Sequence, residues 1–279
     1  MTSFWVPVVA VFLAADPASV KALQEGDAHY ARRAEGARGG QALTAPIEAA
    51  LATYRRALAA DPASLAARSR LMRALFFRST FCGGSPEQNK SLLEEARRTA
   101  DDGLKQIEPS LRGIHGSQRI PALRAIPGSL DLHFWSAVCW GEWALRRGKL
   151  AAARAGAGTK IRDLGQTVVD LDPAYEQGGG YRILGRLHDQ SPRVPFFTMW
   201  ISRDKALAYL ELAQAQGPDN TVNQFFLAEA LLNHFPQRQE EARRLLRQCG
   251  SATPRPEYRV EDAYYAELSR QRLSALGTR

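Results

Sequence analysis

Apolar residues return along most of this chain at three-, four- and seven-residue spacing. This is the period of an α-helix that buries one face, so the pattern predicts amphipathic helices. The clearest of them cover residues 20–33, 65–77, 130–147, 174–188 and 221–233, and a more polar one covers 257–276. No segment sustains the two-residue alternation of a half-buried strand. We therefore predict an all-α protein.

A second set of helices carries an internal repeat of small residues ahead of a proline. In residues 47–62, Ala50 is followed by Tyr54, Ala57 and then Pro62. Similar offsets recur at Ala206, Leu210, Ala213 and Pro218; at Ala242, Leu246, Cys249 and Pro254; and, less closely, at Ala96, Ala100, Leu104 and Pro109 and at Ile161, Gly165, Val168 and Pro173. The pattern resembles the second helix of a tetratricopeptide (TPR) repeat. There, small residues let two helices approach, a tyrosine fills the gap between turns, and proline stops the helix.

These two sets of helices predict how the chain is organised. Each second helix has a first helix before it, which gives about five helix pairs. The prolines are unevenly spaced, so we expect an irregular TPR-like superhelix or bundle over residues 16–279, with the 257–276 helix as a C-terminal cap. Insertions at 36–43, 112–126 and 190–200 interrupt the pairs, and such insertions often gather on the binding face.

The first fifteen residues need a separate interpretation. Residues 4–15 form an apolar run that is too short to span a bilayer as a helix, which takes about 20 residues. The run has the length of the hydrophobic region of a secretory signal peptide, although the first three residues carry no basic side chain. We expect residues 1–15 to be a signal peptide cleaved near Asp16, or alternatively a buried N-terminal apolar segment. No cysteine lies near this run to carry a lipid.

The basic excess does not form a patch in the sequence. The chain has 37 Lys and Arg against 29 Asp and Glu, a net charge of +8. Acidic residues precede basic ones at helical spacing, as in 94–98 and 240–244. This arrangement is typical of solvated helix faces, and a charge-steering partner surface is the alternative. A nucleic-acid partner is not expected, because it would need the positive charge on one stripe.

Residues of the types used in catalytic and metal sites are scattered along the sequence. There is no HExxH, no GxSxG and no GxGxxG after a strand. The histidines are dispersed, and Cys82, Cys139 and Cys249 lie too far apart for a metal motif, so we interpret the cysteines as small buried hydrophobes. We therefore expect no enzyme activity, no metal and no cofactor. A constellation assembled only in the fold stays open.

Two aromatic clusters are the candidate ligand- or partner-binding residues. One lies in the 130–147 helix and the other in the 190–200 insertion: Trp135, Trp140 and Trp143, and Phe196, Phe197 and Trp200. On a helical wheel Trp135 and Trp143 share a core stripe, whereas Trp140 lies on its flank, which must meet another helix, a lumen or a partner. Packing between helices, a pocket for an apolar ligand and a subunit interface are the three interpretations.

Residues 135–232 resemble the TRAP-transporter T-component (TatT) family of periplasmic TPR-like proteins. The resemblance rests on short strings that include a GGxxRxLGRL motif: Phe134-Trp135-Ser136, Gly141-Glu142-Trp143-Ala144, Leu171-Asp172-Pro173-Ala174-Tyr175, Gly178 to Leu187, Ser191-Pro192, Asp204-Lys205-Ala206, and Asn223 with Phe226-Leu227-Ala228-Glu229. The resemblance implies a helical bundle that can trimerise, an interior pore or cleft lined by apolar groups, and pairing with a substrate-binding P-component.

The sequence therefore predicts a binding protein rather than an enzyme. As the resemblance implies, it is a periplasmic accessory scaffold of a TRAP-type transport system that binds a small hydrophobic or organic-acid solute, the substrate-binding subunit, or both. The alternative is a cytoplasmic TPR adaptor that binds a peptide or protein in its concave groove. The motif residues themselves are interpreted as structural: Gly180 and Gly185 allow close helix approach, and Pro173 and Pro218 stop helices.

Overall fold

The computed structural model describes residues 16–192 and 198–277. Within them the chain is all-α, as the spacing of its apolar residues predicts. Extended pairing there is limited to two isolated β-bridges, Arg38 with Gln41 and Ala42 with Cys82. No helix in these two ranges is both long and apolar enough to cross a membrane. The predicted signal peptide, residues 1–15, lies outside the described residues.

Most of the helices pack as consecutive pairs. The pairs are α1 (Pro17–Ala31) with α2 (Thr44–Ala60), α3 (Leu65–Phe81) with α4 (Pro86–Ile107), α6 (Ser129–Arg147) with α8 (Ala157–Leu171), α9 (Gly179–Gln190) with α10 (Arg203–Gln216), and α11 (Thr221–His234) with α12 (Gln239–Ser251). The final helix is α13 (Arg259–Gly277), and the short α5 (Arg119–Arg124) and α7 (Lys149–Arg154) lie in connections.

The second helix of each pair stops where the repeat pattern places a proline. These helices end at Ala60, Ile107, Leu171, Gln216 and Ser251, just ahead of Pro62, Pro109, Pro173, Pro218 and Pro254. Proline cannot donate a backbone hydrogen bond, and it disfavours helical geometry in the residue before it. The small residues of the pattern lie at the contact between helices: Ala50 and Ala57 are 0% exposed. A Cβ on Gly26 of α1 would lie 2.5 Å from the ring of Tyr54, so this glycine makes room for the tyrosine.

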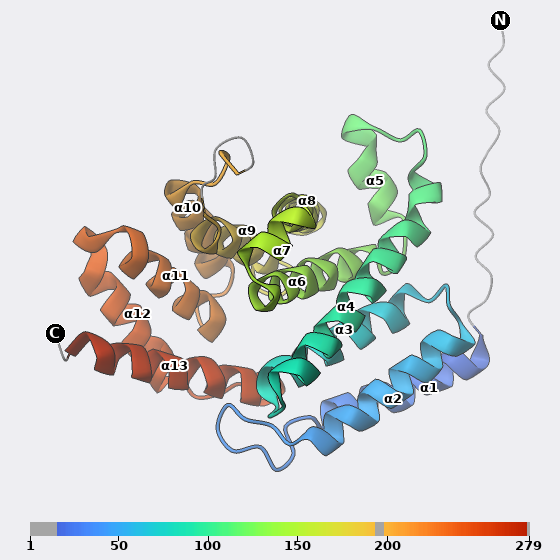
Figure 1. Ribbon diagram of the computed structural model, residues 1–279, viewed down its shortest axis with the longest axis horizontal. Coiled ribbons are helices and arrows are strands. Elements are labelled where there is room, and N and C mark those ends of the chain that lie inside the picture. The colour runs from blue at the N-terminus through green and yellow to red at the C-terminus, as the bar shows by residue number, and fades with distance from the viewer. Residues whose placement is uncertain (1–15, 193–197, 278–279) are drawn as a thin grey trace, which may run out of the picture.

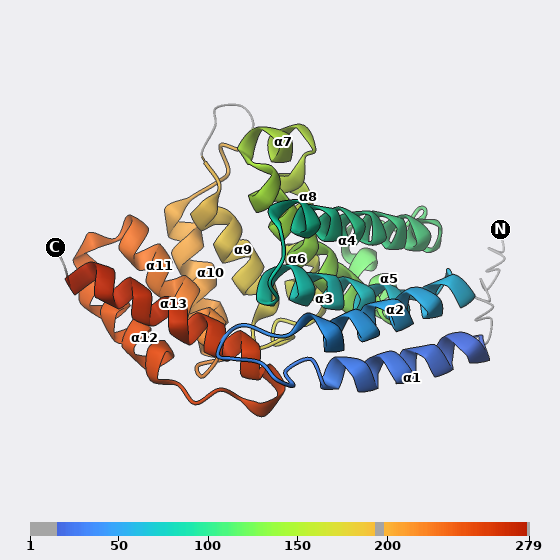
Figure 2. The same cartoon turned by 60° about the horizontal axis from the view of Figure 1, so that its bottom comes forward.

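The first helices of the last four pairs form a ring that α13 completes. α3, α6, α9 and α11 each contact the next one in this order, and α13 contacts both α11 and α3. Figure 1 shows α13 running along one side of the molecule, from α11 and α12 to the end of α3. Figure 2 shows the same course from another direction. The last helix therefore packs on α12 and also returns to the N-terminal half of the chain.

Three contacts hold α13 against the N-terminal half. Arg33 forms an ion pair with Glu261 at 2.9 Å, in which both side chains are largely buried. Phe81 packs edge-on against Tyr264, with the ring centres 5.3 Å apart. Gly40 lies so close to α13 that a Cβ there would be 2.7 Å from the backbone nitrogen of Tyr264. Each of these contacts joins the N-terminal half of the chain to α13 near its C-terminal end. The ring is therefore closed by contacts between segments far apart in the sequence.

Candidate functional site in the interior of the helix ring

The interior of the ring carries a set of charged and aromatic side chains, named the interior cluster below. Its members are Glu142 and Arg146 of α6, Arg182 and Arg186 of α9, Phe226 of α11, and Tyr264 and Tyr265 of α13. Burial raises the pKa of Tyr264 and of Tyr265, and the charge of Glu142 adds to both rises. All seven side chains keep part of their surface accessible. Convergent polar groups that stay accessible inside a fold are typical of binding sites.

Arg182 brings a charge to the interior without forming an ion pair with a carboxylate in the described part of the chain. Its Nη1 donates to Asn223 Oδ1 at 2.8 Å and to the carbonyl of Glu176 at 3.3 Å, and both acceptors are neutral. Burial lowers the pKa of Arg182, an effect that the carboxylate of Glu176 opposes. No ion pair to Arg182 occurs within 16–192 and 198–277. The guanidinium is therefore fixed in position while part of its charge remains available.

The other two arginines of the cluster differ in how firmly they are held. Arg186 pairs with the buried carboxylate of Asp189 at 2.8 Å, and its guanidinium carbon lies 4.4 Å from the ring centre of Phe226. This combines an ion pair with a cation–π contact. Arg146 is exposed and donates from Nη2 to the carbonyl of Ser79 at 3.3 Å. Arg146 is therefore the least firmly held donor of the three.

Glu142 is the carboxylate of the interior cluster. Among the residues described, no hydrogen bond or ion pair joins its oxygens to a partner. Burial raises its pKa, and the charges of Arg146 and Arg186 oppose that rise. A half-buried carboxylate without a direct partner is uncommon, because the charged form is poorly solvated there.

The connection from α8 to α9 determines where Arg182 lies. Glu176 and Gln177 both have left-handed backbone conformations, with φ of 49° and 56°. Residues other than glycine rarely adopt this conformation, so the surrounding structure must hold them in place. Asn223 Nδ2 donates to the backbone carbonyl of Gln177 at 3.0 Å, and Asn220 Nδ2 donates to the side-chain Oε1 of Gln177 at 2.8 Å. The start of α11 thus fixes this loop, and the loop fixes the start of α9.

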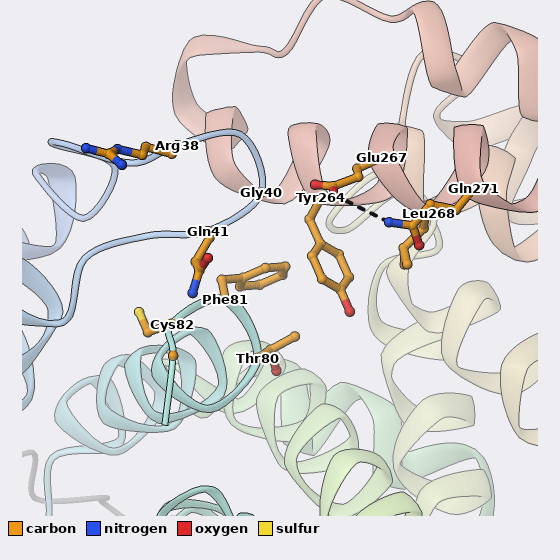
Figure 3. A pocket seen from close by; sticks show the side chains of 11 residues that line it. Arg38, Gly40, Gln41, Thr80, Phe81, Cys82, Tyr264, Glu267, Leu268 and Gln271 are labelled. Atoms are coloured by element: carbon orange, nitrogen blue, oxygen red, sulfur yellow. Dashed lines mark hydrogen bonds between the residues drawn. The ribbon is translucent and has the colours of Figure 1, made fainter. Parts of the chain in front are cut away.

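A hollow of about 400 Å³ lies where α13 meets the end of α3 and the 38–41 loop (Figure 3). Its walls come from these three segments: Arg38, Gly40 and Gln41; Thr80, Phe81, Cys82 and Gly83; and Tyr264, Glu267, Leu268 and Gln271. In Figure 3 the ring of Tyr264 extends from α13 toward α3. Tyr264 belongs both to the wall of the hollow and to the interior cluster. The charge of Glu142 raises its pKa and that of Arg146 lowers it. Burial raises the pKa of Cys82 to about 11, so its thiol is protonated at pH 7.

Trp140 and Trp143, two of the predicted binding residues, pack together on the side of α6 that faces α4. They are 4% and 7% exposed. Their indole nitrogens donate to Asp101 Oδ1 at 3.1 Å and to Glu94 Oε2 at 2.7 Å, both on α4. Trp140, on the flank of the predicted stripe, therefore meets another helix, which is one of the three kinds of neighbour that the helical wheel allows for it. Both α4 and α8 cover α6, so the buried arc of α6 is wider than a single stripe.

We expect Trp140→Ala and Trp143→Ala each to lower the free energy of unfolding by about 3–5 kcal/mol, the usual cost of truncating a buried aromatic residue. Trp135→Ala is expected to cost clearly less, because Trp135 is only half-buried. Chemical denaturation of the three variants measures this order. If Trp140→Ala is as mild as a surface change while Trp143→Ala is severe, Trp140 serves an interface or a ligand as the helical wheel suggests.

The remaining predicted aromatic residues lie elsewhere. Trp135 packs between Phe76 and Phe134, with ring centres 6.1 and 5.0 Å away. Trp200 lies edge-on to His188 at 5.4 Å, and burial lowers the pKa of His188 to about 4, so its imidazole is neutral at pH 7. Phe196 and Phe197 lie outside the described residues. A binding role for these aromatic residues therefore stays a prediction.

None of the interior cluster is among the binding residues that the sequence predicts. Glu142, Arg182, Arg186 and Phe226 all stand in the strings that carry the family resemblance, whose residues the sequence analysis interprets as structural. A charged residue on an amphipathic helix normally faces solvent, and the closure of the ring is what turns that face inward. The available signal was the pair Arg182 and Arg186, one turn apart in a glycine-rich helix.

A metal site is not formed by the described residues, in which no three His, Cys, Asp or Glu side chains are grouped to hold an ion. No family model matches the chain, and no curated protein matches its sequence. Among solved structures the chain is similar to the TPR2AB domain of yeast Sti1, from a complex with pHSP90. The identity is 12%, the match covers 92% of this chain and 97% of that chain, and the TM-score is 0.31. A similarity of this size does not bear on function.

Proposed function

We propose that this chain is a non-catalytic binding protein whose helix ring holds a small organic acid. The observation that carries the proposal is that Arg146 and Arg182 face the interior with only neutral acceptors as partners in the described chain. Guanidinium groups bind carboxylates through charge-assisted, often paired hydrogen bonds. A carboxylate that enters the ring supplies the charged acceptor that these two arginines lack.

The charges and the aromatic rings of the cluster favour an anion with an apolar body. Three arginines face one carboxylate there, and among the residues that the structure describes only Arg186 forms an ion pair with another acidic residue, Asp189. This positive excess in a partly buried site attracts anions. Phe226 and Tyr265 meet edge-on with ring centres 5.7 Å apart, and they offer apolar surface for the carbon skeleton of the ligand. A hydrophobic organic acid fits both features.

The closed ring supports a compact ligand over an extended one. In a peptide-binding adaptor the first helices line an open groove, whereas here α13 contacts α3 and completes the ring. The peptide adaptor is therefore the less favoured candidate.

The transport context follows from the family resemblance and is part of the proposal. Glu142, Arg182, Asn223 and Phe226 stand in three of the strings of that resemblance and converge on the interior of one ring. This convergence supports a common role in holding a solute. We accordingly place the protein in the periplasm as an accessory component of a TRAP-type system. There it exchanges the acid with the substrate-binding subunit, either alone or as a trimer.

Thermal melts in the presence of acetate, succinate, octanoate and phenylacetate test the binding function. A ligand that binds only the folded state raises the melting temperature, by an amount that corresponds to about 2.7 kcal/mol at a hundredfold excess over its Kd. We expect octanoate or phenylacetate to raise the melting temperature more than acetate does, because only these two carry an apolar body. If no acid in the panel shifts the melt, the proposed function is wrong.

The adjacent residues Arg146 and Arg147 provide a matched pair of variants. Both are exposed, but Arg146 turns to the interior, whereas Arg147 lies beside Trp143 and 3.5 Å from Glu94. We expect Arg146→Gln to weaken binding of the acid about tenfold, since hydrogen bonds to charged groups contribute about 1.5–3 kcal/mol. Arg147→Gln should leave binding unchanged. Equal effects of the two variants in a calorimetric titration would place the ligand outside the ring.

A further inference from the structure

We propose that the hollow between α13, the end of α3 and the 38–41 loop is a second binding site, which takes a small organic amine in its protonated form. The proposal goes beyond the acid-binding function. None of the three arginines of the interior cluster lines the hollow, and the site favours a ligand of the opposite charge.

The hollow has the size and the composition of a small-molecule site. Its volume of about 400 Å³ lies within the range of about 300–1,000 Å³ that is usual for ligand pockets. Apolar side chains of α3 and α13 form part of its wall, and polar side chains of the loop and of α13 lie among them: Phe81, Tyr264 and Leu268, and Gln41, Glu267 and Gln271. A few polar groups in such a wall fix the orientation of a bound ligand.

Two aromatic rings are held in place at the hollow. Phe81 and Tyr264 meet edge-on with ring centres 5.3 Å apart, and Figure 3 shows the two rings next to each other. Phe77 packs on Phe81 at 5.2 Å, and Tyr265 packs on Tyr264 at 5.3 Å. The face of an aromatic ring is negative and attracts cations. The wall therefore favours an apolar body that carries a positive charge.

Glu267 supplies a carboxylate at the same hollow. Within 16–192 and 198–277 the ion pairs of α13 use Glu261, Asp262 and Arg272, and they leave Glu267 unpaired. Gln271 Nε2 donates to Glu267 Oε1 at 3.4 Å, the dashed line of Figure 3. A Cβ on Gly39 would lie 4.0 Å from Glu267 Oε2, so the carboxylate lies between α13 and the loop. A protonated amine provides the charged donor that this carboxylate lacks in the described chain.

Arg38 is the cation among the residues that line the hollow. Its side chain is exposed, and in Figure 3 its guanidinium points away from Glu267 and from Tyr264. Solvent and salt screen a charge in this position. Of the charges that act on Tyr264, two are carboxylates, Glu142 and Glu267, and one is the guanidinium of Arg146. An amine therefore fits the hollow better than an acid does.

Calorimetric titration at pH 7 with phenethylamine and 2-phenylethanol tests the charge preference. The two probes have nearly the same size and shape, but only the amine is charged at this pH, since alkyl amines titrate near pH 10. We expect the amine to bind about fivefold more tightly than the alcohol, which is the upper end for a charge pair open to solvent. Equal affinities, or no binding of the amine, would overturn the proposal.

Glu267→Gln should remove this difference, weakening the amine about fivefold and leaving the alcohol unchanged. Glu87→Gln is the matched control, because Glu87 is also an exposed glutamate without an ion pair in the described chain and does not line the hollow. It changes the net charge equally and should leave the affinity for the amine as it is. Equal effects of the two variants would show that net charge, not a site at the hollow, attracts the amine.

A titration of phenethylamine into protein saturated with phenylacetate separates the two sites. We expect both ligands to bind together, with the affinity for the amine within about twofold of that without the acid, as for independent sites. Displacement of the acid by the amine would place the amine inside the ring and overturn the proposal. Failure of phenylacetate to bind would count against the acid-binding function alone, because the titrations of the amine and the alcohol do not use it.

Discussion

We expect Tyr54→Ala to lower the free energy of unfolding by about 3–5 kcal/mol, a large part of the roughly 5–15 kcal/mol by which a protein of ordinary stability is held folded. The side chain of Tyr54 is 0% exposed and fills the space between α1 and α2 that Gly26 leaves open. Truncation leaves a cavity that two already packed helices cannot close. It also removes the hydrogen bond from the Tyr54 hydroxyl to Asp27, which is 2.8 Å long.

Urea denaturation of Tyr54→Ala beside Tyr54→Phe separates the two contributions. The phenylalanine variant keeps the ring and loses only the hydroxyl, so it should cost about 0.5–1.5 kcal/mol, the net contribution of one hydrogen bond. If the alanine variant costs no more than the phenylalanine variant, the ring is not the element that spaces α1 and α2. The interpretation of α1 and α2 as a TPR-like pair would then be wrong.

Gly40→Ala is expected to loosen the closure of the ring. The added Cβ would lie 2.7 Å from the backbone nitrogen of Tyr264, and a helix backbone cannot move away as a flexible side chain can. Overpacking of this kind costs about 1–3 kcal/mol. Because Tyr264 lines the hollow and faces Glu142, the displacement of α13 also disturbs the interior cluster. We expect affinity for the organic acid to fall at least tenfold.

Cys82 provides a direct readout of this opening. It is buried at the wall of the hollow, whereas Cys139 and Cys249 are 0% exposed within the helix packing. In Gly40→Ala, a thiol reagent should modify Cys82 several times faster than in the wild type, with the other two cysteines unchanged. Gly83→Ala is the control at the same hollow, because its Cβ would meet only Gln41 Nε2 at 3.4 Å. Equal labelling rates in the two variants would show that Gly40 does not hold the ring closed.

Local features of the fold were accessible from the sequence because local physics determines them. The spacing of Ala50, Tyr54 and Ala57 requires a helix with one tightly packed face, and Pro62 limits its length. The same reasoning recovers the ends of α4, α8, α10 and α12. These conclusions need no knowledge of which helices meet across the molecule.

The closure of the ring could not be obtained in this way. Arg33 and Glu261 form an ion pair across almost the whole chain, and nothing in the helical period of either segment indicates it. Whether Glu142 faces solvent or a protein interior depends on that closure. The burial of Trp140 has a similar cause, since it depends on α4 and α8 both covering α6. Helix pairs therefore follow from spacing, whereas the site follows from how the pairs are arranged.

A crystal structure of the protein with phenylacetate or octanoate tests the central claim most directly, namely that the closed ring of α3, α6, α9, α11 and α13 encloses a site for an organic acid. We predict density for the acid inside the ring, with its carboxylate about 3 Å from guanidinium nitrogens of Arg146 or Arg182 and its carbon skeleton against Phe226. An interior that holds only water, with the acid bound on the outer helices or not at all, would contradict the account.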